Sequence, residues 1–316
     1  MFPPDADPAD VVAEARLAEE LGFDFLACGE HLFFHVPTTN AFIALAAAAG
    51  ATDRIRLVSA LTVLPLYPAV LAAKLATTLD RVSRGRFELG VGVGGEFPAE
   101  FDAVGVPVRE RGRRTDESLR VFRELETGEP VSFTGEFTSL DGLAMLPRPV
   151  HRPRIPVWIG GRSDAALRRA ARFGDVWLPY MITPDKMAAA VPRLRAETAA
   201  QGRPSDAVRA GVFCWSGVAD DPAHARQTAV DHVSRLYQQD FEDLAERYLL
   251  TGDPARVLAR LGEYAAAGTT EVVFAPACGP AERPAMVRRF AAEVLPVAQG
   301  WSSPAAATRS TENGSP

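Results

Sequence analysis

Residues 53–94, DRIRLVSALTVLPLYPAVLAAKLATTLDRVSRGRFELGVGVG, contain a strand, a helix and a second strand in succession. Residues 55–63 are a short apolar, β-rich run that predicts a strand, and residues 69–80 have the length and spacing of a helix. Residues 86–91 predict the second strand, which leads into glycines. Two strands joined by a helix are typical of a parallel sheet, so this stretch predicts an α/β fold.

The same alternation continues on both sides of this stretch. Further strands are predicted at 23–28, 155–159, 176–179, 210–218 and 271–275. Further helices are predicted at 10–21, 41–49, 108–125, 164–173, 184–200, 222–250, 254–267 and 281–297. These are seven strands, and a barrel needs an eighth. Residues 1–4 lie where the first strand of a barrel would end, so we expect that strand to be a stub or to lie upstream of Met1.

The chain is expected to form a single domain over residues 1–300. Residues 127–154 interrupt the periodicity with prolines and glycines, which predicts an insertion that forms a lid or a substrate wall at the mouth of a barrel. Residues 301–316 are rich in Ser, Thr, Ala and Pro, and we expect them to be disordered.

The composition favours a protein that acts on a small molecule. With 34 basic and 40 acidic residues the net charge is −6, which gives no electrostatic basis for binding nucleic acid or an anionic membrane. The uncharged stretches 36–52 and 57–73 are interrupted by Pro, so neither is expected to span a membrane. The cysteines lack disulfide or metal spacing and no secretory pattern precedes them, which favours the cytoplasm.

Glu30 and His31 directly follow the predicted strand at 23–28. In a parallel barrel this strand end is where catalytic residues gather. A histidine there can donate or accept a proton near neutral pH, and the neighbouring carboxylate can orient it or bind a polar ligand. Two alternatives stay open: His31 packs locally at the strand end, or His31 and His35 bind a metal through their i, i+4 spacing.

The run Gly90-Val91-Gly92-Val93-Gly94-Gly95 formally contains G-x-G-x-x-G. It follows the third recognisable strand, and no acid-ended strand appears about 20 residues later, so the context is wrong for a dinucleotide fingerprint. We interpret these glycines as letting the chain pass close under a planar ligand, with Glu96 near its reacting face. A purely structural tight turn is the alternative.

A second glycine loop predicts an anion site. Its residues lie between a strand and a helix, where freed backbone N–H groups, a helix N-terminus, an Arg and a Ser all favour a phosphate. They are Gly160, Gly161, Arg162 and Ser163. The alternative is that Ser163 is only the N-cap of the following helix.

Several segments in this order resemble the bacterial-luciferase-like superfamily, particularly the branch that uses the deazaflavin coenzyme F420. They are AEELGFDFLACGEH (18–31), the stretch 53–94, ERGRRTDESLRVF (110–122), PVSFTGEFTSL (130–140) and RPRIPVWIGGRSDAALRRAARFGDVWLP (152–179). The resemblance implies a (β/α)8 TIM barrel with a flavin or deazaflavin ring at its C-terminal mouth.

The resemblance also implies roles for individual residues. Ser59-Ala60 is the nearest match to a non-prolyl cis peptide that backs the ring, and Thr62 is expected to line the same surface. Glu30 and His31 match the family's acid–histidine pair, where Asp is the more usual acid, and the resemblance implies that Glu30 contacts the cofactor.

The two glycine loops fall where the family contacts its cofactor. Gly94, Gly95 and Glu96 match the loop that sometimes supplies an acidic group, which makes Glu96 a candidate catalytic residue beside His31. The phosphate loop is matched by Gly160, Gly161, Arg162 and Ser163.

The activity implied is hydride transfer between coenzyme F420 and a small organic substrate, with His31 as proton donor or acceptor. An FMN-dependent monooxygenase that uses O2 is the first alternative, and a non-enzymatic flavin-binding member is the second. A metal-dependent barrel hydrolase is the remaining class. The resemblance further implies a homodimer.

Overall fold

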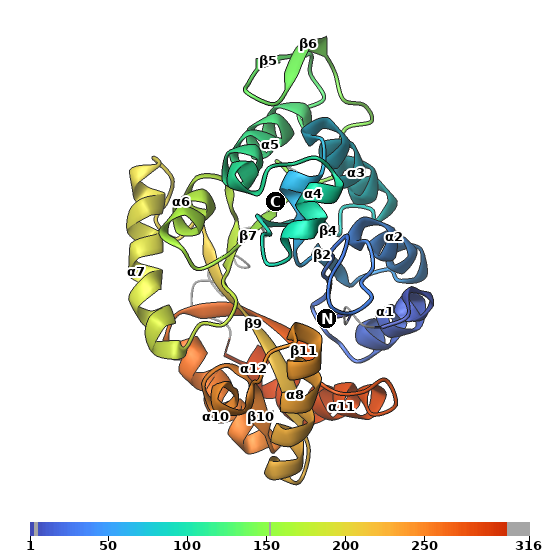
Figure 1. Cartoon of the computed structure of the whole chain (residues 1–316), viewed down its shortest axis with the longest axis vertical. Helices are drawn as coiled ribbons and strands as arrows, with labels where there is room; N and C mark the ends of the chain where they lie inside the picture. The colour runs from blue at the N-terminus through green and yellow to red at the C-terminus, as the bar shows by residue number, and fades with distance from the viewer. Residues whose placement is uncertain (3–5, 152, 302–316) are drawn as a thin grey trace, which may run out of the picture. The chain divides into compact units, whose positions relative to one another are not determined.

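The computed structural model describes residues 1–2, 6–151 and 153–301 (Figure 1). These residues form two compact units: Met1–Tyr180 with Leu194–Val208, and Met181–Arg193 with the residues from Arg209 onward. The chain passes between the units three times, and the expectation of a single domain stays a prediction. Apart from Trp301, the predicted disordered tail lies outside the described residues.

The first unit contains a parallel sheet in the order β1-β2-β4-β7-β8, with β3 also paired to β4. Its register places Cys28 beside Ser59 and Val91 beside Ile159, so neighbouring strands end at the same edge. The second unit contains β10, β9 and β11, which are also parallel. The strands are β1 (Phe25–Cys28), β2 (Arg56–Ser59), β3 (Thr62–Val63), β4 (Phe87–Gly92), β5 (Val131–Thr134), β6 (Ser139–Leu143), β7 (Val157–Gly160), β8 (Val176–Leu178), β9 (Arg209–Val218), β10 (Leu250–Gly252) and β11 (Thr269–Pro276).

Helices alternate with these strands, and α2 packs on β2 while α3 packs on β4 (Figure 1). The α-helices are α1 (Val11–Glu20), α2 (Ala41–Ala51), α3 (Ala69–Val82), α4 (Pro98–Ala103), α5 (Arg111–Leu125), α6 (Asp164–Phe173), α7 (Pro184–Ala200), α8 (Pro222–Tyr237), α9 (Ala245–Tyr248), α10 (Pro254–Ala266), α11 (Arg283–Arg289) and α12 (Leu295–Gln299). Short 3-10 turns lie at Pro8–Asp10, Leu64–Leu66, Val108–Glu110 and Glu242–Leu244.

Local sequence explains where the helices nearest the site begin. Asn40 is the N-cap of α2, and its side chain accepts a hydrogen bond from the N–H of Ile43 at 3.1 Å. Ser163 is the N-cap of α6 and accepts from the N–H of Ala166 at 3.2 Å, and whether it also helps to bind a phosphate stays a prediction. All four residues of β7 are buried, as expected for a parallel strand covered on both faces.

Three predicted elements differ from the structure because tertiary contacts interrupt them. The strand predicted at 55–63 is divided into β2 and β3 by a turn. The helix predicted at 222–250 ends at Tyr237, where Gln238 adopts a left-handed conformation. The rest of the range contains the short helix α9, and only its last residue, Leu250, belongs to β10. The helix predicted at 281–297 contains a π-helical turn at Phe290–Val294.

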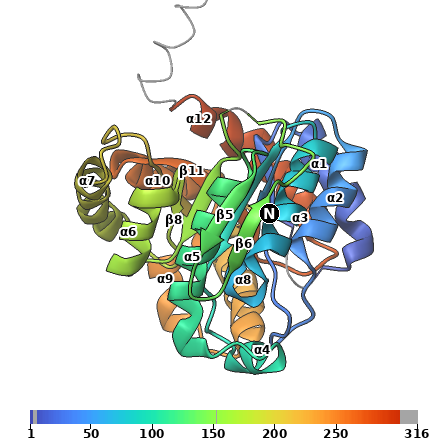
Figure 2. The same cartoon turned by 90° about the horizontal axis from the view of Figure 1, so that it is seen from above.

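The insertion predicted at 127–154 contains the antiparallel hairpin β5–β6. This segment connects the helix α5 to the strand β7. The tip of the hairpin packs on α5, and Figure 2 shows the two side by side. The buried Glu117 carboxylate of α5 accepts hydrogen bonds from the N–H groups of Glu136 and Phe137 at 2.7 and 2.9 Å. The expectation that this segment forms a lid at the mouth is therefore wrong, because a helix-to-strand connection leaves from the opposite end of the strands.

Phe2 stands where the first strand was expected. It forms an isolated parallel bridge with Cys28, its N–H donates to the carbonyl of Ala27 at 2.7 Å, and its side chain is buried. This bridge matches the expected stub. In the described part of the chain no helix is both long and apolar enough to cross a membrane.

Candidate active site

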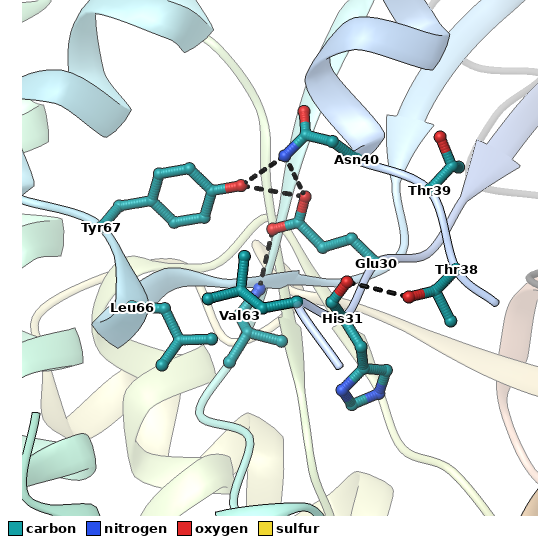
Figure 3. A pocket seen from close by; sticks show the side chains of 9 residues that line it. Glu30, His31, Thr38, Thr39, Asn40, Val63, Leu66 and Tyr67 are labelled. Carbon is teal, nitrogen blue, oxygen red and sulfur yellow. Dashed lines mark hydrogen bonds between the residues drawn. The ribbon is translucent and has the colours of Figure 1, made fainter. Parts of the chain in front are cut away.

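Glu30 lies just beyond β1, and its carboxylate accepts four hydrogen bonds, of which those from Asn40, Val63 and Tyr67 are drawn in Figure 3. Oε1 accepts from the N–H of Val63 at 3.2 Å. Oε2 accepts from the N–H of Ala41 at 3.0 Å, from Asn40 Nδ2 at 3.1 Å and from the Tyr67 hydroxyl at 3.1 Å. The side chain of Glu30 is therefore joined to β3, to the start of α2 and to the turn before α3.

Burial raises the pKa values of both Glu30 and Tyr67. Glu30 is only 7% exposed, and burial raises the pKa of its carboxyl above the ordinary value, although its hydrogen bonds act in the opposite direction. Burial also raises the pKa of the Tyr67 phenol, and the neighbouring Glu30 charge adds to that shift. Tyr67 therefore stays protonated at neutral pH and donates to Glu30.

His31 is held by a second buried carboxylate, Glu100 of α4. Its Nδ1 lies 3.2 Å from Oε2 and 3.3 Å from Oε1 of Glu100, which is fully buried and also accepts from the N–H of Leu32 at 3.2 Å. Phe34 stacks on the imidazole with a centroid distance of 4.4 Å. An ionised carboxylate only accepts, so Nδ1–H donates to an ionised Glu100, and Nε2 of a neutral His31 is then the ring nitrogen without a proton.

A cavity of about 230 Å³ lies beside this pair and is drawn in Figure 3. The carboxylate of Glu30, the amide of Asn40 and the hydroxyl of Tyr67 form its mutually hydrogen-bonded polar wall. Its lining comprises Glu30, His31, Leu32, Thr38, Thr39, Asn40, Val63, Leu66 and Tyr67. His31 thus borders a space that a small group of a ligand can enter.

The turn between β2 and β3 contains the non-prolyl cis peptide, but at Ala60–Leu61. The match to Ser59-Ala60 is therefore wrong by one residue. Ser59 instead binds β4, because its hydroxyl accepts from the N–H of Gly90 at 2.8 Å and donates to the Gly90 carbonyl at 3.1 Å. A Cβ on Gly29 would lie 3.0 Å from the Ala60 carbonyl oxygen, so the turn lies against the segment that leads to Glu30 and His31.

Thr62 follows this turn and carries an unpaired polar atom. Its side chain is fully buried, and Oγ1 has no hydrogen-bond partner among the described residues. A buried hydroxyl without a partner is costly, and such atoms mark places where a ligand or water completes the bonding. The expectation that Thr62 lines the ring surface stays a prediction.

Gly90 of the first glycine run and Gly160 of the second have packing roles that the sequence did not show. A Cβ on Gly90 would overlap the Ser59 carbonyl, and a Cβ on Gly160 of β7 would overlap the side chain of Leu61. The lack of a side chain at these two positions leaves room for the turn that contains the cis peptide. Gly94 and Gly95 have positive φ angles of 61° and 105°, and Gly95 lies against the Arg111 side chain.

Glu96 is exposed, and the carboxylate that contacts His31 is that of Glu100. Sequence reasoning chose the acid that directly follows the glycines and missed the one four residues later. The available signal was the segment 98–103, where Pro98 begins a short helix that turns Glu100 inward. Tyr67 and Asn40 were also missed, because they contact Glu30 only through the tertiary fold.

The second glycine loop lies at the end of β7. Gly161 has a φ of 98°, and its carbonyl accepts from the Trp177 indole N–H at 2.8 Å. Arg162 is exposed, and its guanidinium lies 3.5 Å from the Tyr180 carbonyl oxygen. The loop and the N-terminus of α6 therefore combine backbone N–H groups with a cationic side chain, which is suitable for a phosphate.

Groups of three or more His, Cys, Asp or Glu side chains arranged for a metal ion do not occur in the part of the chain that the structure describes. The described polar contacts of the His31 ring are with Glu100. These contacts favour proton transfer as the chemistry of His31.

Solved structures resemble most of the chain, among them a monooxygenase and a reductase. Monooxygenase RslO1 from Streptomyces bottropensis is 26% identical with a TM-score of 0.81, covering 93% of this chain and 97% of that one. Coenzyme F420-dependent tetrahydromethanopterin reductase from Methanopyrus kandleri has a TM-score of 0.78 over 94% of this chain and 97% of that one, and at 22% identity it is similar in fold alone. These likenesses confirm the predicted fold class, an α/β protein of the TIM-barrel type.

Curated relatives resemble parts of the chain. An uncharacterized protein of Mycobacterium tuberculosis is 38% identical over 164 residues, which are 51% of this chain and 56% of the relative. The FMNH2-dependent dimethylsulfone monooxygenase of Pseudomonas putida is 31% identical over 232 residues, which are 70% of this chain and 61% of that enzyme. The matches thus span between half and two thirds of the length of these relatives.

A family model described as luciferase-like monooxygenase matches residues 3–271. The match includes the end of β1 with Glu30 and His31, the cis turn before Thr62 and both glycine loops. The chain therefore belongs to the luciferase-like monooxygenase family.

Proposed function

We propose that the chain is an oxidoreductase that binds a reduced flavin or deazaflavin beside His31 and acts on a small organic substrate. The observation that carries this proposal is the His31–Glu100 pair at the end of β1, next to the cis turn and the cavity. Family membership and the fold support it. The expected homodimer and the cytoplasmic location stay predictions.

The residues present fit a phosphate-bearing ring cofactor. Thr62 offers a buried hydroxyl without a partner in the described chain, at the cis turn. The loop 160–163 offers backbone N–H groups at the start of α6 together with the Arg162 guanidinium. When bound, such a cofactor supplies the hydride or, in the case of FMN, the reaction with dioxygen.

The chain's own residues position groups and move a proton. Glu100 accepts a hydrogen bond from Nδ1–H and thereby holds the imidazole in one tautomer, as a carboxylate does for a catalytic histidine elsewhere. Nε2 then accepts a proton from the substrate or donates one to it. Phe34 covers one face of the ring, which restricts the access of water to that face.

Reduced FMN is the first candidate cofactor, because the dimethylsulfone monooxygenase, named as FMNH2-dependent, is 31% identical over 70% of this chain. F420 is the second candidate. It is favoured by the resemblance of the motifs to the F420-dependent branch and by the fold shared with an F420-dependent reductase. Hydride transfer would be the reaction with F420, and oxygen insertion the reaction with FMN.

The test is an anaerobic titration of the full-length protein with reduced FMN and, separately, with reduced F420, followed by the absorbance or fluorescence of the ring. Turnover is then measured over a panel of small organic substrates, as oxygen consumption with FMN or as F420 oxidation. We expect His31→Ala to keep cofactor affinity and to lower kcat by about 10²- to 10⁴-fold, the usual contribution of a general acid or base. Glu100→Gln is expected to lower kcat by a smaller factor.

His35→Ala is the matched control. His35 is an exposed histidine in the same loop, and its described contacts are with the rings of Phe34 and Phe97. Binding of F420 alone would select the second candidate. Failure of both cofactors to bind would refute the proposal. Equal losses of kcat in His31→Ala and His35→Ala would show that His31 is not the general acid or base.

A further inference from the structure

Residues 31–39, here termed the His31 loop, connect β1 to α2 and carry exposed apolar side chains. Leu32 is 42% exposed and Phe33 is 55% exposed. One hydrogen bond crosses the loop, from the Thr38 hydroxyl to the His31 carbonyl at 2.8 Å. Burial of Leu32 and Phe33 therefore contributes little to holding this loop, although Phe34 packs on His31 and Phe97, so contacts at the two ends of the loop matter for its position.

The Glu30 carboxylate joins these ends. Glu30 precedes the loop, and Asn40 and Ala41 follow it, yet Oε2 of Glu30 accepts from the side chain of Asn40 and from the N–H of Ala41. Oε1 accepts from the N–H of Val63, which ties the same point to β3. The base of the His31 loop is thus closed by one buried side chain.

The acceptor capacity of this carboxylate is used within the protein. A carboxylate offers about four lone-pair sites, and four donors already occupy Glu30. Asn40 Nδ2 also donates to the Tyr67 hydroxyl at 2.6 Å, so the donors are themselves held in place. The sequence suggested that Glu30 contacts the cofactor, but its contacts run into the protein.

Two carboxylates therefore divide the task of placing His31. Glu100 contacts the imidazole ring and the N–H of Leu32. Glu30 contacts the residues beyond the far end of the loop. Glu100 can orient the imidazole ring only if Glu30 keeps the main chain around His31 in one place.

We propose that Glu30 is a positioning residue that closes the base of the His31 loop and thereby holds His31 in register with Glu100, rather than a ligand of the cofactor. This inference rests on the proposed function for its role in turnover. Its structural part does not depend on which cofactor binds.

The experiment compares hydrogen–deuterium exchange of cofactor-free wild type and Glu30→Gln, read on the peptide that covers residues 31–41. Glutamine keeps one accepting oxygen but places an NH2 group where the other oxygen accepted, so the hydrogen bonds to that oxygen are lost and an N–H group faces a donor. A hydrogen bond to a charged group contributes about 1.5–3 kcal/mol, so we expect exchange of this peptide to rise roughly tenfold or more. Tyr67→Phe, which removes one donor, is expected to give a smaller rise and serves as a second variant if Glu30→Gln does not fold.

Glu126→Gln is the matched control. Glu126 is also a buried carboxylate, 6% exposed, which accepts from the N–H of Ile155 at 3.0 Å and from Arg123 Nη1 at 2.8 Å, away from the His31 loop. It should lower overall stability without a selective change in residues 31–41. This comparison separates loss of position from general loss of stability.

Cofactor affinity and turnover complete the test. We expect Glu30→Gln to bind reduced FMN or F420 as wild type does and to lose kcat. Unchanged exchange of residues 31–41 in both variants would overturn the proposal. A tenfold or greater loss of cofactor affinity in Glu30→Gln would also overturn it, since Glu30 would then be a ligand. If neither cofactor binds wild type, the proposed function fails, while the exchange result still judges the loop.

Discussion

Thr62 shows how a single atom can indicate a ligand. Its buried Oγ1 has no partner among the described residues, whereas the equally buried Thr77 donates to the carbonyl of Lys74 at 3.2 Å. An unpaired buried hydroxyl lowers stability, because its hydrogen bonds to water are lost and nothing replaces them. The fold tolerates that cost beside the cis turn, which is consistent with a cofactor that restores the bond.

Thr62→Val is expected to have opposite effects on stability and on binding. Replacing the hydroxyl by a methyl of similar shape should raise the free energy of unfolding of the cofactor-free protein by about 1 kcal/mol, and it should weaken cofactor binding. Thr77→Val is the control, and it should lower stability because a satisfied hydrogen bond is removed. Denaturant unfolding without cofactor measures the stability of each variant, and titration with reduced FMN or F420 measures its cofactor affinity. Equal destabilisation by the two substitutions would contradict this account.

At the scale of elements, a buried contact between the hairpin β5–β6 and α5 requires a glycine at position 135. Gly135 leaves room for the Glu117 carboxylate, and a Cβ there would lie 2.5 Å from it. That carboxylate is buried and accepts from the N–H groups of Glu136 and Phe137, so it cannot move aside freely. Arg114 lies over the ring of Phe137 at 4.2 Å and adds a cation–π contact.

Gly135→Ala is therefore expected to lower the free energy of unfolding by about 1–3 kcal/mol, the cost of disturbing a buried charged acceptor. It should also expose residues 131–143 to limited proteolysis. Gly50→Ala is the control, because Gly50 lies in α2 with no atom near the added methyl, and alanine there should be neutral or stabilising by up to about 1 kcal/mol. Unchanged proteolysis of the hairpin in Gly135→Ala would show that the contact does not hold it.

At the scale of the whole molecule, each compact unit contains at least one buried cysteine thiol. Cys28 lies in the first unit, and Cys214 and Cys278 lie in the second. Burial raises the pKa of Cys28 and of Cys214 to about 12, so each stays a thiol at ordinary pH. The thiol form is unreactive, which makes these cysteines reporters of unfolding.

We expect a thiol reagent at pH 8 to label none of the three cysteines in the native protein and all of them in denaturant. Mass spectrometry of the labelled peptides checks this and gives a separate rate for each unit. The direction follows from the raised pKa, since the reactive thiolate appears only as the pH approaches that value. Rapid labelling of Cys28 or Cys214 in the native protein would contradict the burial described.

The sequence by itself determined the order of most strands and helices, the parallel α/β class, the glycine loops and the position of His31 at a strand end. These features follow from local patterns: apolar periodicity, capping residues such as Ser163, and glycines where the chain turns. The resemblance of several segments in order also identified the family. Local patterns failed at β10 and at the division of residues 55–63, where pairing with neighbouring strands decides the conformation.

Only the tertiary structure decided which side chains meet at the site. Glu30 and Tyr67 are 37 residues apart, and His31 and Glu100 are 69 apart, so no local spacing relates them. Glu96 directly follows the glycines and attracted the prediction, yet it is exposed, while the helix α4 places Glu100 at His31. Burial raises the pKa of Glu30 and leaves the Thr62 hydroxyl without a partner in the described part of the chain, and it is a property of the packed chain that neither residue type reveals in the sequence.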